Sequence, residues 1–130
     1  MQDRPTSAEL LATLGEYLEE ELMPALDGPL AYRTRVAANL VRILERENAL
    51  GPASLRRERE LLSGLLGVEP SRSDSLMDDV LDLNRQVAAA IDAGRIDHAR
   101  AWPVLMEIAR AKLSIIRPGY DAWDSAVELP

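Results

Sequence analysis

Apolar residues recur at spacings of three and four along most of this chain, which is the pattern of one buried face on an α-helix. Prolines and glycines divide the pattern into five segments, and none shows the alternation of apolar and polar residues that marks a half-buried strand. The sequence therefore predicts an all-α fold, a five-helix bundle with a short C-terminal tail. The predicted helices run from residue 6 to a turn at 27–29, over 30–50, over 53–66, from residue 73 or 75 to 94, and from 97 to 117.

The predicted helix boundaries rest on capping and stop signals. Thr6 followed by Glu9 is a capping-box pattern, in which each side chain satisfies a backbone N–H at the start of a helix. Gly51 and Pro52 predict the end of one helix and the start of the next, because glycine suits a helix C-terminus and proline suits a first turn. Pro103 predicts a break between the first turn of the last helix and its main body. The cap candidates of the last two helices are Ser73 or Ser75 and Asp97.

Each predicted helix has an apolar stripe that we expect to contribute to one core. In chain order the stripes are Leu10, Leu11, Leu14, Leu18 and Leu22; Val36, Leu40, Ile43 and Leu44; Leu55, Leu62 and Leu66; Leu76, Val80, Leu83, Val87 and Ile91; Leu105, Ala109, Leu113 and Ile116. The charged run at residues 56–60 is interpreted as a solvated face. A chain of 130 residues is long enough for a single core, so we predict one domain over residues 1–117 and an acidic tail over 118–130.

Polar side chains interrupt three of these helices at or beside the apolar stripe. Asn84 falls near the middle of its stripe, Lys112 falls inside its stripe, and Asn39 lies at the margin of its own. Arg35 and Arg46 share a ridge of that helix with Asn39, and Glu47, four residues after Ile43, points toward its apolar side. Burying an amide or an ammonium group is costly unless it is hydrogen-bonded. These six residues therefore form the candidate polar cluster.

The favoured interpretation of this cluster is a structural network between helices. A lysine paired with Glu47, or one amide between two helices, would fix which helices pack together and in what register. Lys112 can also lay its methylene groups on the core and keep its ammonium in water. Glu45, Glu47 and the acidic run at residues 19–21 offer partners for the arginines.

The alternative interpretation is an anion-binding pocket. Arg35, Arg46 and Lys112 would bind a carboxylate or phosphate group. Asn39 and Asn84 would orient the polar atoms of that ligand. The sequence leaves both interpretations open.

Composition and charge narrow the classes of function. The formal net charge is −7, which argues against nucleic-acid and anionic-membrane partners because both select basic surfaces. No apolar stretch is long enough to span a bilayer and no signal-peptide pattern is present, so a cytoplasmic protein is expected. Cysteine is absent, and His98 is the only histidine. No motif predicts a metal, a cofactor or a catalytic residue, which favours a protein that is not an enzyme.

Several segments carry a family resemblance. They are residues 3–6 with Glu9 and Leu10, residues 22–26, residues 35–39 with Arg46 and Glu47, residues 83–85, residues 111–113, and Pro118 with Tyr120. In these segments the chain resembles a bacterial helical domain of unknown function. That domain occurs alone or attached to aminoglycoside-phosphotransferase-like proteins, often near acyl-CoA dehydrogenase genes. The resemblance implies that its recurring polar positions are Arg35, Asn39, Arg46, Asn84 and Lys112.

The resemblance also implies a function by association. It suggests an accessory role beside a phosphotransferase-like kinase or an acyl-CoA-handling enzyme. We therefore predict a non-catalytic interaction module, with Trp102 and Trp123 as candidate interface anchors. The alternatives are a carboxylate- or phosphate-binding protein or enzyme that uses the polar cluster, and a homo-oligomer.

Overall fold

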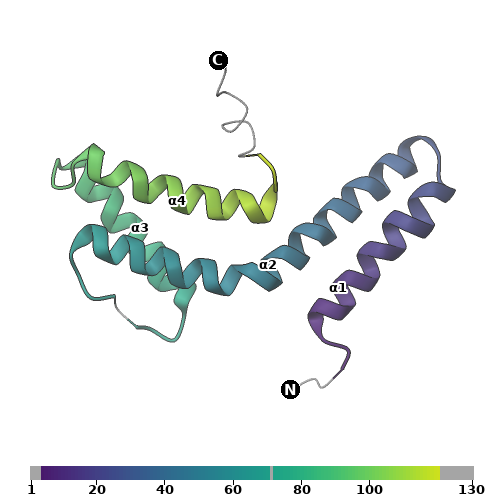
Figure 1. Ribbon diagram of the computed structural model, residues 1–130, viewed down its shortest axis with the longest axis horizontal. Helices are drawn as coiled ribbons and strands as arrows, with labels where there is room; N and C mark the ends of the chain where they lie inside the picture. Colours follow the sequence, from purple (N-terminus) through teal and green to yellow (C-terminus); the bar gives the residue numbers. More distant parts are fainter. Residues whose placement is uncertain (1–3, 71, 121–130) are drawn as a thin grey trace, which may run out of the picture. The chain divides into compact units, whose positions relative to one another are not determined.

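The computed structural model describes residues 4–70 and 72–120 and shows an all-α protein (Figure 1). Its elements are α1 (Ser7–Glu16), the π-helix η1 (Tyr17–Leu22), the 3₁₀ helix η2 (Met23–Ala25), α2 (Gly28–Leu66), α3 (Leu76–Asp92) and α4 (His98–Ile116). The all-α prediction is confirmed. The predicted count of five helices is wrong, because the described residues form four α-helices.

The miscount comes from α2, which continues through Gly51 and Pro52 for 39 residues. Proline has no N–H to donate to the carbonyl four residues earlier, here that of Asn48, so it usually ends or kinks a helix. Its fixed φ is nevertheless helical, and packing on both sides can hold the helix together. Pro103 behaves in the same way, because it lies inside α4, and the predicted break there is also wrong.

Local capping signals are confirmed at three helix starts. The Thr6 side chain accepts a hydrogen bond from the Glu9 N–H at 3.2 Å, and the Thr6 N–H donates to the Glu9 carboxylate at 2.7 Å. Ser75 caps α3 by accepting from the Asp78 N–H at 3.2 Å. Asp97 caps α4 by accepting from the Ala99 N–H at 3.2 Å. These contacts span two or three residues, which is why sequence alone could place them.

The chain divides into two compact units, residues 1–51 and residues 52–130. The boundary lies between Gly51 and Pro52, where the sequence pattern placed a helix end. The prediction of one domain over residues 1–117 stays a prediction, since two compact units can still unfold in one transition. Of the predicted tail, residues 118–120 form a turn, and 121–130 lie outside the described residues.

The first unit is a helical hairpin in which α1 and the first part of α2 run side by side in opposite directions (Figure 1). Small residues form the contact face, since Gly15 of α1 and Ala38 of α2 are both buried. Val41 is buried on the same face of α2. Near the open end, the Ser7 hydroxyl donates to the Asn48 side-chain oxygen at 3.1 Å.

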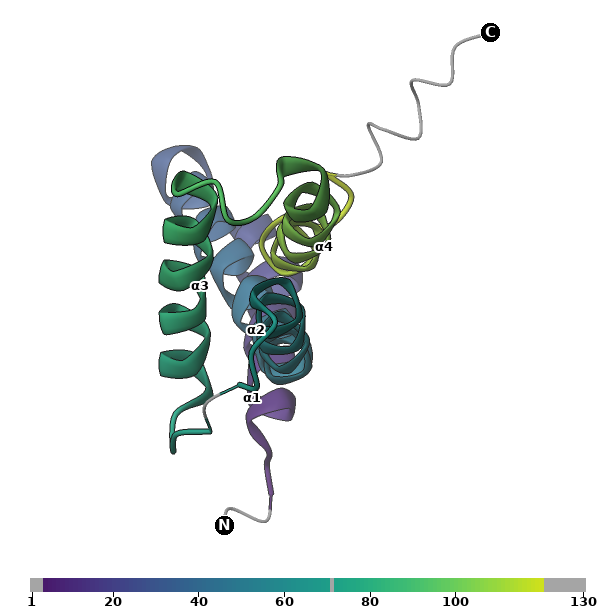
Figure 2. The ribbon, with the colours of Figure 1, turned by 90° about the vertical axis from the view of Figure 1, so that its left-hand side faces the viewer.

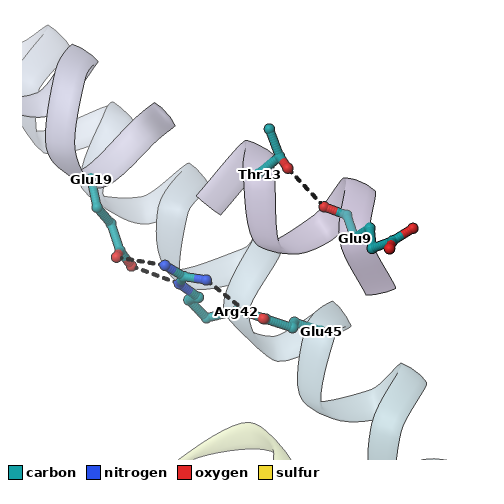
Figure 3. A network of polar contacts seen from close by, with 5 residues as sticks. All are labelled: Glu9, Thr13, Glu19, Arg42 and Glu45. Atoms are coloured by element: carbon teal, nitrogen blue, oxygen red, sulfur yellow. Dashed lines mark hydrogen bonds and ion pairs between the residues drawn. The ribbon is translucent and has the colours of Figure 1, made fainter. Parts of the chain in front are cut away.

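An arginine on α2 joins the two arms of the hairpin (Figure 3). The Arg42 guanidinium donates to both carboxylate oxygens of Glu19, at 3.0 and 2.9 Å, and to Glu45 at 2.8 Å. A Cβ atom on Gly15 would lie 2.7 Å from Arg42 Cζ, so the glycine makes room for this side chain. Hydrogen bonding to Arg42 lowers the pKa of Glu19, and the two glutamates raise the pKa of Arg42. Bidentate pairing fixes geometry as well as charge.

Three of the four residues in the predicted core stripe of residues 30–50 are exposed, and the fourth, Ile43, is half-buried. Leu40 is two positions from the buried Ala38, which places it about 200° around the helix. Val36 is 43%, Leu40 55% and Leu44 55% exposed. We call Val36, Leu40 and Leu44 the outer stripe. Leu10 and Leu14 of α1 are also about half exposed. The prediction that these residues form a core is wrong, because helix periodicity does not show which face meets a neighbour.

The second unit packs the later part of α2 with α3 and α4. Figure 2 looks along α4 and this part of α2, while α3 runs across them. The core consists of Leu62, Leu65, Val80, Leu83, Val87, Ala90, Ile96, Ala101 and Ile108, with Leu55, Leu66, Leu76 and Ile91 packed against it. The predicted stripes of residues 53–66 and of α3 are therefore confirmed. None of the described helices is long and apolar enough to cross a membrane.

The predicted stripe of α4 is displaced around the helix. Ala101, Ile108 and Ile115 are buried, whereas Leu105 and Ile116 are exposed. The buried face of α4 is therefore formed by Ala101, Ile108 and Ile115 and not by the predicted stripe. Lys112 consequently lies at the edge of the buried face rather than inside it, about 40° beyond Ile108.

A buried aspartate ties α2 to the start of α3. Asp79 is 6% exposed and accepts hydrogen bonds from the Ser73 N–H at 3.2 and 3.3 Å. Arg59 Nη1 on α2 lies 3.6 Å from Asp79 Oδ2. Hydrogen bonding to Ser73, reinforced by the charge of Arg59, lowers the pKa of Asp79 below its ordinary value of 3.8.

Replacing Pro52 by alanine should stabilise the protein, because the new N–H can donate to the Asn48 carbonyl inside α2. We expect Pro52→Ala to raise the free energy of unfolding by about 1–3 kcal/mol, measured by chemical denaturation. Pro29→Ala is the matched control: Pro29 lies in the first turn of the same helix, where the N–H has no helical partner. Equal effects of the two substitutions would contradict the explanation.

The pKa of Asp79 predicts a pH-dependent contribution to stability. A carboxyl group with a lowered pKa in the folded state stabilises it above the unfolded pKa and loses that effect as the pH falls through the folded value. Asp79→Asn should therefore lower the melting temperature at pH 7, and the gap to the wild type should close below about pH 4. Thermal denaturation followed by circular dichroism measures both curves. A gap that stays constant with pH would show that the ionised carboxylate is not responsible.

Candidate functional site

The polar site of the second unit is organised by Glu58, a residue in the middle of α2. Glu58 is 3% exposed although it belongs to the charged run 56–60. It lies one helical turn before Leu62, which is fully buried, so it extends the core-facing side of α2. The interpretation of the whole run as a solvated face is therefore wrong at this position.

Asn84 on α3 and Lys112 on α4 both bind Glu58. Asn84 Nδ2 donates to Glu58 Oε1 at 3.0 Å and to the Val80 carbonyl at 3.0 Å. Lys112 Nζ donates to the same Oε1 at 3.0 Å. We call Glu58, Asn84 and Lys112 the polar triad. One residue comes from each of the three helices of the second unit.

The electrostatics of the polar triad are asymmetric. The Glu58 side chain is 4% exposed, whereas the Lys112 side chain is 55% exposed. A buried carboxylate needs an opposite charge and hydrogen-bond donors, and the triad supplies both. The ammonium group has three donors and uses one on Glu58, so its other donors can reach solvent or an anion. Chemically, the arrangement can fix the register of three helices or hold a small anion at its open side.

The structure places the six residues of the predicted cluster in two groups. Asn84 and Lys112 belong to the second unit and share Glu58. The other four, Arg35, Asn39, Arg46 and Glu47, belong to the first unit. The network interpretation expected Lys112 to pair with Glu47. In the structure Lys112 pairs with Glu58 instead.

The first-unit members lie mostly on the surface of α2. Arg35, Asn39 and Glu47 are exposed, and Arg46 is half-buried with interactions of its own. Glu47 folds back beside Gly51, where a Cβ atom would lie 2.6 Å from Glu47 Oε1. Arg42 on the same helix, which is not part of the predicted cluster, forms the ion pairs described above.

Sequence reasoning missed Glu58, although a signal was present. Glu58 is three residues after Leu55 and four before Leu62, and both leucines were assigned to the core stripe. A glutamate between two core positions on one face is as unusual as Asn84 or Lys112. Because charged residues surround Glu58 in the sequence, the whole run was interpreted as a solvated face.

Of the two candidate interface tryptophans, the structure describes only Trp102. Trp102 in the first turns of α4 is 67% exposed, which leaves its indole available to a partner. Trp123 lies outside the described residues. The prediction that they anchor an interface stays untested.

Fold and site together define an all-α protein with a helical hairpin, a three-helix unit and a buried polar triad. Residues 24–120 match the family model described as a domain of unknown function, DUF6285. The match spans most of the chain, so the protein belongs to this family. No curated protein and no solved structure matches the sequence. The resemblance to a helical domain of unknown function is thus supported, and the family description adds no activity.

A double-mutant cycle measures how strongly Lys112 and Glu58 are coupled. Lys112→Met leaves the buried carboxylate with only its amide partner and should lower the free energy of unfolding by about 1–2 kcal/mol. Glu58→Met in addition removes the unpaired charge, so the double variant should lose less than the sum of the single losses. Strictly additive losses in denaturant titrations would contradict the pairing.

Proposed function

We propose that this protein is a non-catalytic interaction module that binds its partner through the outer stripe of the first unit. The supporting observation is the placement of Val36, Leu40 and Leu44. These apolar residues lie four positions apart along α2, and each is about half exposed. Scattered exposed leucines are ordinary, but a row of them along a helix is typical of a surface that packs on another helix or groove.

The hairpin does not need these side chains for its own packing. Ala38 and Val41 are buried on the contact face of α2, and Arg42 joins the arms through Glu19. Leucines at the outer stripe therefore contribute little to the hairpin itself. Burying one fully against a partner would contribute about 1.5–3 kcal/mol. Exposed apolar side chains that the hairpin does not need are expected if a partner buries the outer stripe.

The family resemblance suggests the kind of partner. Domains of this type occur attached to phosphotransferase-like proteins, so an aminoglycoside-phosphotransferase-like protein of the same source is the first candidate. An acyl-CoA-handling enzyme is the second. Both candidates rest on the family resemblance alone. With either partner, the helix that carries the outer stripe would dock into an apolar groove.

The alternative is a carboxylate- or phosphate-binding protein that uses the predicted Arg/Asn/Lys cluster. It has weaker support, because Asn84 and Lys112 already bind Glu58. Both side chains are needed to satisfy the buried Glu58 carboxylate. A bound anion would therefore have to share the Lys112 ammonium group with Glu58.

The interaction can be tested with charged substitutions on the outer stripe. Leu40→Glu with Leu44→Glu should weaken binding to the phosphotransferase-like protein at least about thirtyfold, because two leucines would be lost from the contact. Calorimetric titration with the purified partner measures the change. The helical signal in circular dichroism should stay unchanged, since both residues are about half exposed.

Leu81→Glu is the matched control, because Leu81 is 46% exposed on α3 of the second unit. It should bind the partner as the wild type does. Absence of any complex at micromolar concentrations with both candidate partners would overturn the proposal. Light scattering on the protein alone provides a further check: self-association abolished by the double substitution would assign the outer stripe to a second copy instead.

A further inference from the structure

The second unit contains a groove that neither the polar triad nor the outer stripe uses. It has a volume of about 480 Å³ and lies where the C-terminal ends of α2 and α3 meet the start of α4. Leu65, Ala90 and Ile96 form its buried apolar floor. Gln86, Arg95 and Arg100 supply its polar groups. Volumes of this size are typical of sites for small organic molecules.

Two glycines shape the groove by ending the helices that border it. Gly67 ends α2 with φ +68°, and the next N–H, that of Val68, donates back to the Ser63 carbonyl at 3.1 Å. Gly94 ends α3 with φ +70°, and the Arg95 N–H donates to the Ala90 carbonyl at 2.8 Å. Left-handed glycines turn the chain back over the helix end. Val68 and Arg95 are thereby held at the groove by backbone hydrogen bonds.

The groove concentrates positive charge in an acidic protein. Among the described residues, no carboxylate lies within ion-pair distance of Arg95 or Arg100. Arg100 donates one hydrogen bond to the Leu65 carbonyl at 3.2 Å, and the remaining N–H groups of its guanidinium are directed elsewhere. Arg42, Arg57 and Arg59, by contrast, are paired with carboxylates. Arg95 and Arg100 thus bring two guanidinium groups to one groove in a chain of net charge −7.

We propose that this groove binds a small aliphatic anion, with its carboxylate or phosphate head on Arg95 and Arg100 and its hydrocarbon part on the apolar floor. Guanidinium groups pair with planar or tetrahedral oxyanions through charge-assisted hydrogen bonds. The floor of leucine, alanine and isoleucine favours a hydrocarbon over a simple inorganic ion. The proposal is independent of the outer stripe, which lies in the other unit.

Binding is tested on the 130-residue chain with three probes that carry the same eight-carbon chain: octanoate, octyl phosphate and octanol. At least one of the two anions should saturate at or below about 1 mM in amide chemical-shift titrations, with the shifts concentrated at residues 65–68, 86–90 and 95–100. Comparison of octanoate with octyl phosphate identifies the head group. Octanol should bind at least about tenfold more weakly, because it cannot form the charge-assisted contacts.

Two substitutions separate the charge from the shape of the groove. Arg95→Ala should weaken anion binding at least about tenfold, since it removes one guanidinium and no other described side-chain contact. Ala89→Phe adds a ring at an exposed groove position and should block both anions without disturbing the core. Arg56→Ala is the matched control, because Arg56 is an exposed arginine of the same unit outside the groove. Circular dichroism verifies that each variant folds.

Three results would overturn the proposal. The first is that neither anion saturates or shifts the groove amides. The second is that octanol binds as tightly as the anions, and the third is that Arg56→Ala weakens binding as much as Arg95→Ala. None of these results bears on partner binding by the outer stripe, so the two proposals can fail separately.

Discussion

The burial of the Glu58 carboxylate constrains the second unit more than any other single feature. A buried charge is tolerated only when it is paired and hydrogen-bonded, so the helices around it must bring donors to one point. Asn84 and Lys112 do so from α3 and α4. Apolar contacts are non-directional, so on their own they specify helix register less strictly than a hydrogen-bonded buried charge does. Because donors from α3 and α4 must both reach the same Glu58 oxygen, the three helices can pack in only one register.

The first unit solves a different packing problem. Gly15 and Ala38 are buried in its two helices, Gly15 makes room for Arg42, and the bidentate pair of Arg42 with Glu19 fixes the alignment of the two arms. Small residues on the inside leave the leucines of α2 on the outside. That inversion of the usual amphipathic arrangement is the reason for proposing the outer stripe as a surface for association.

The two proposed binding surfaces use different physical effects. The outer stripe offers apolar area to a protein partner, whereas the groove combines an apolar floor with the charges of Arg95 and Arg100. Under the two proposals, the second unit would bind a small anion and the first unit would engage a protein partner. Neither surface requires a catalytic group, and both are compatible with a family that has no described activity.

The sequence by itself determined what depends on near neighbours. The all-α class, the caps at Thr6, Ser75 and Asp97, and the apolar face of α3 follow from hydrogen bonds and periodicity within a few residues. It also marked Asn84 and Lys112 as polar residues in need of partners. Periodicity identifies a face, however, and does not say what covers it.

Tertiary structure decided the features that depend on distant residues. It kept α2 continuous through Pro52, turned Leu40 outward, and buried Glu58 between two helices that follow it in the chain. These outcomes depend on contacts between residues far apart in sequence, whose free energies outweigh local preferences. The polar residues that first stood out therefore found their partner in a glutamate that local charge patterning had assigned to the surface.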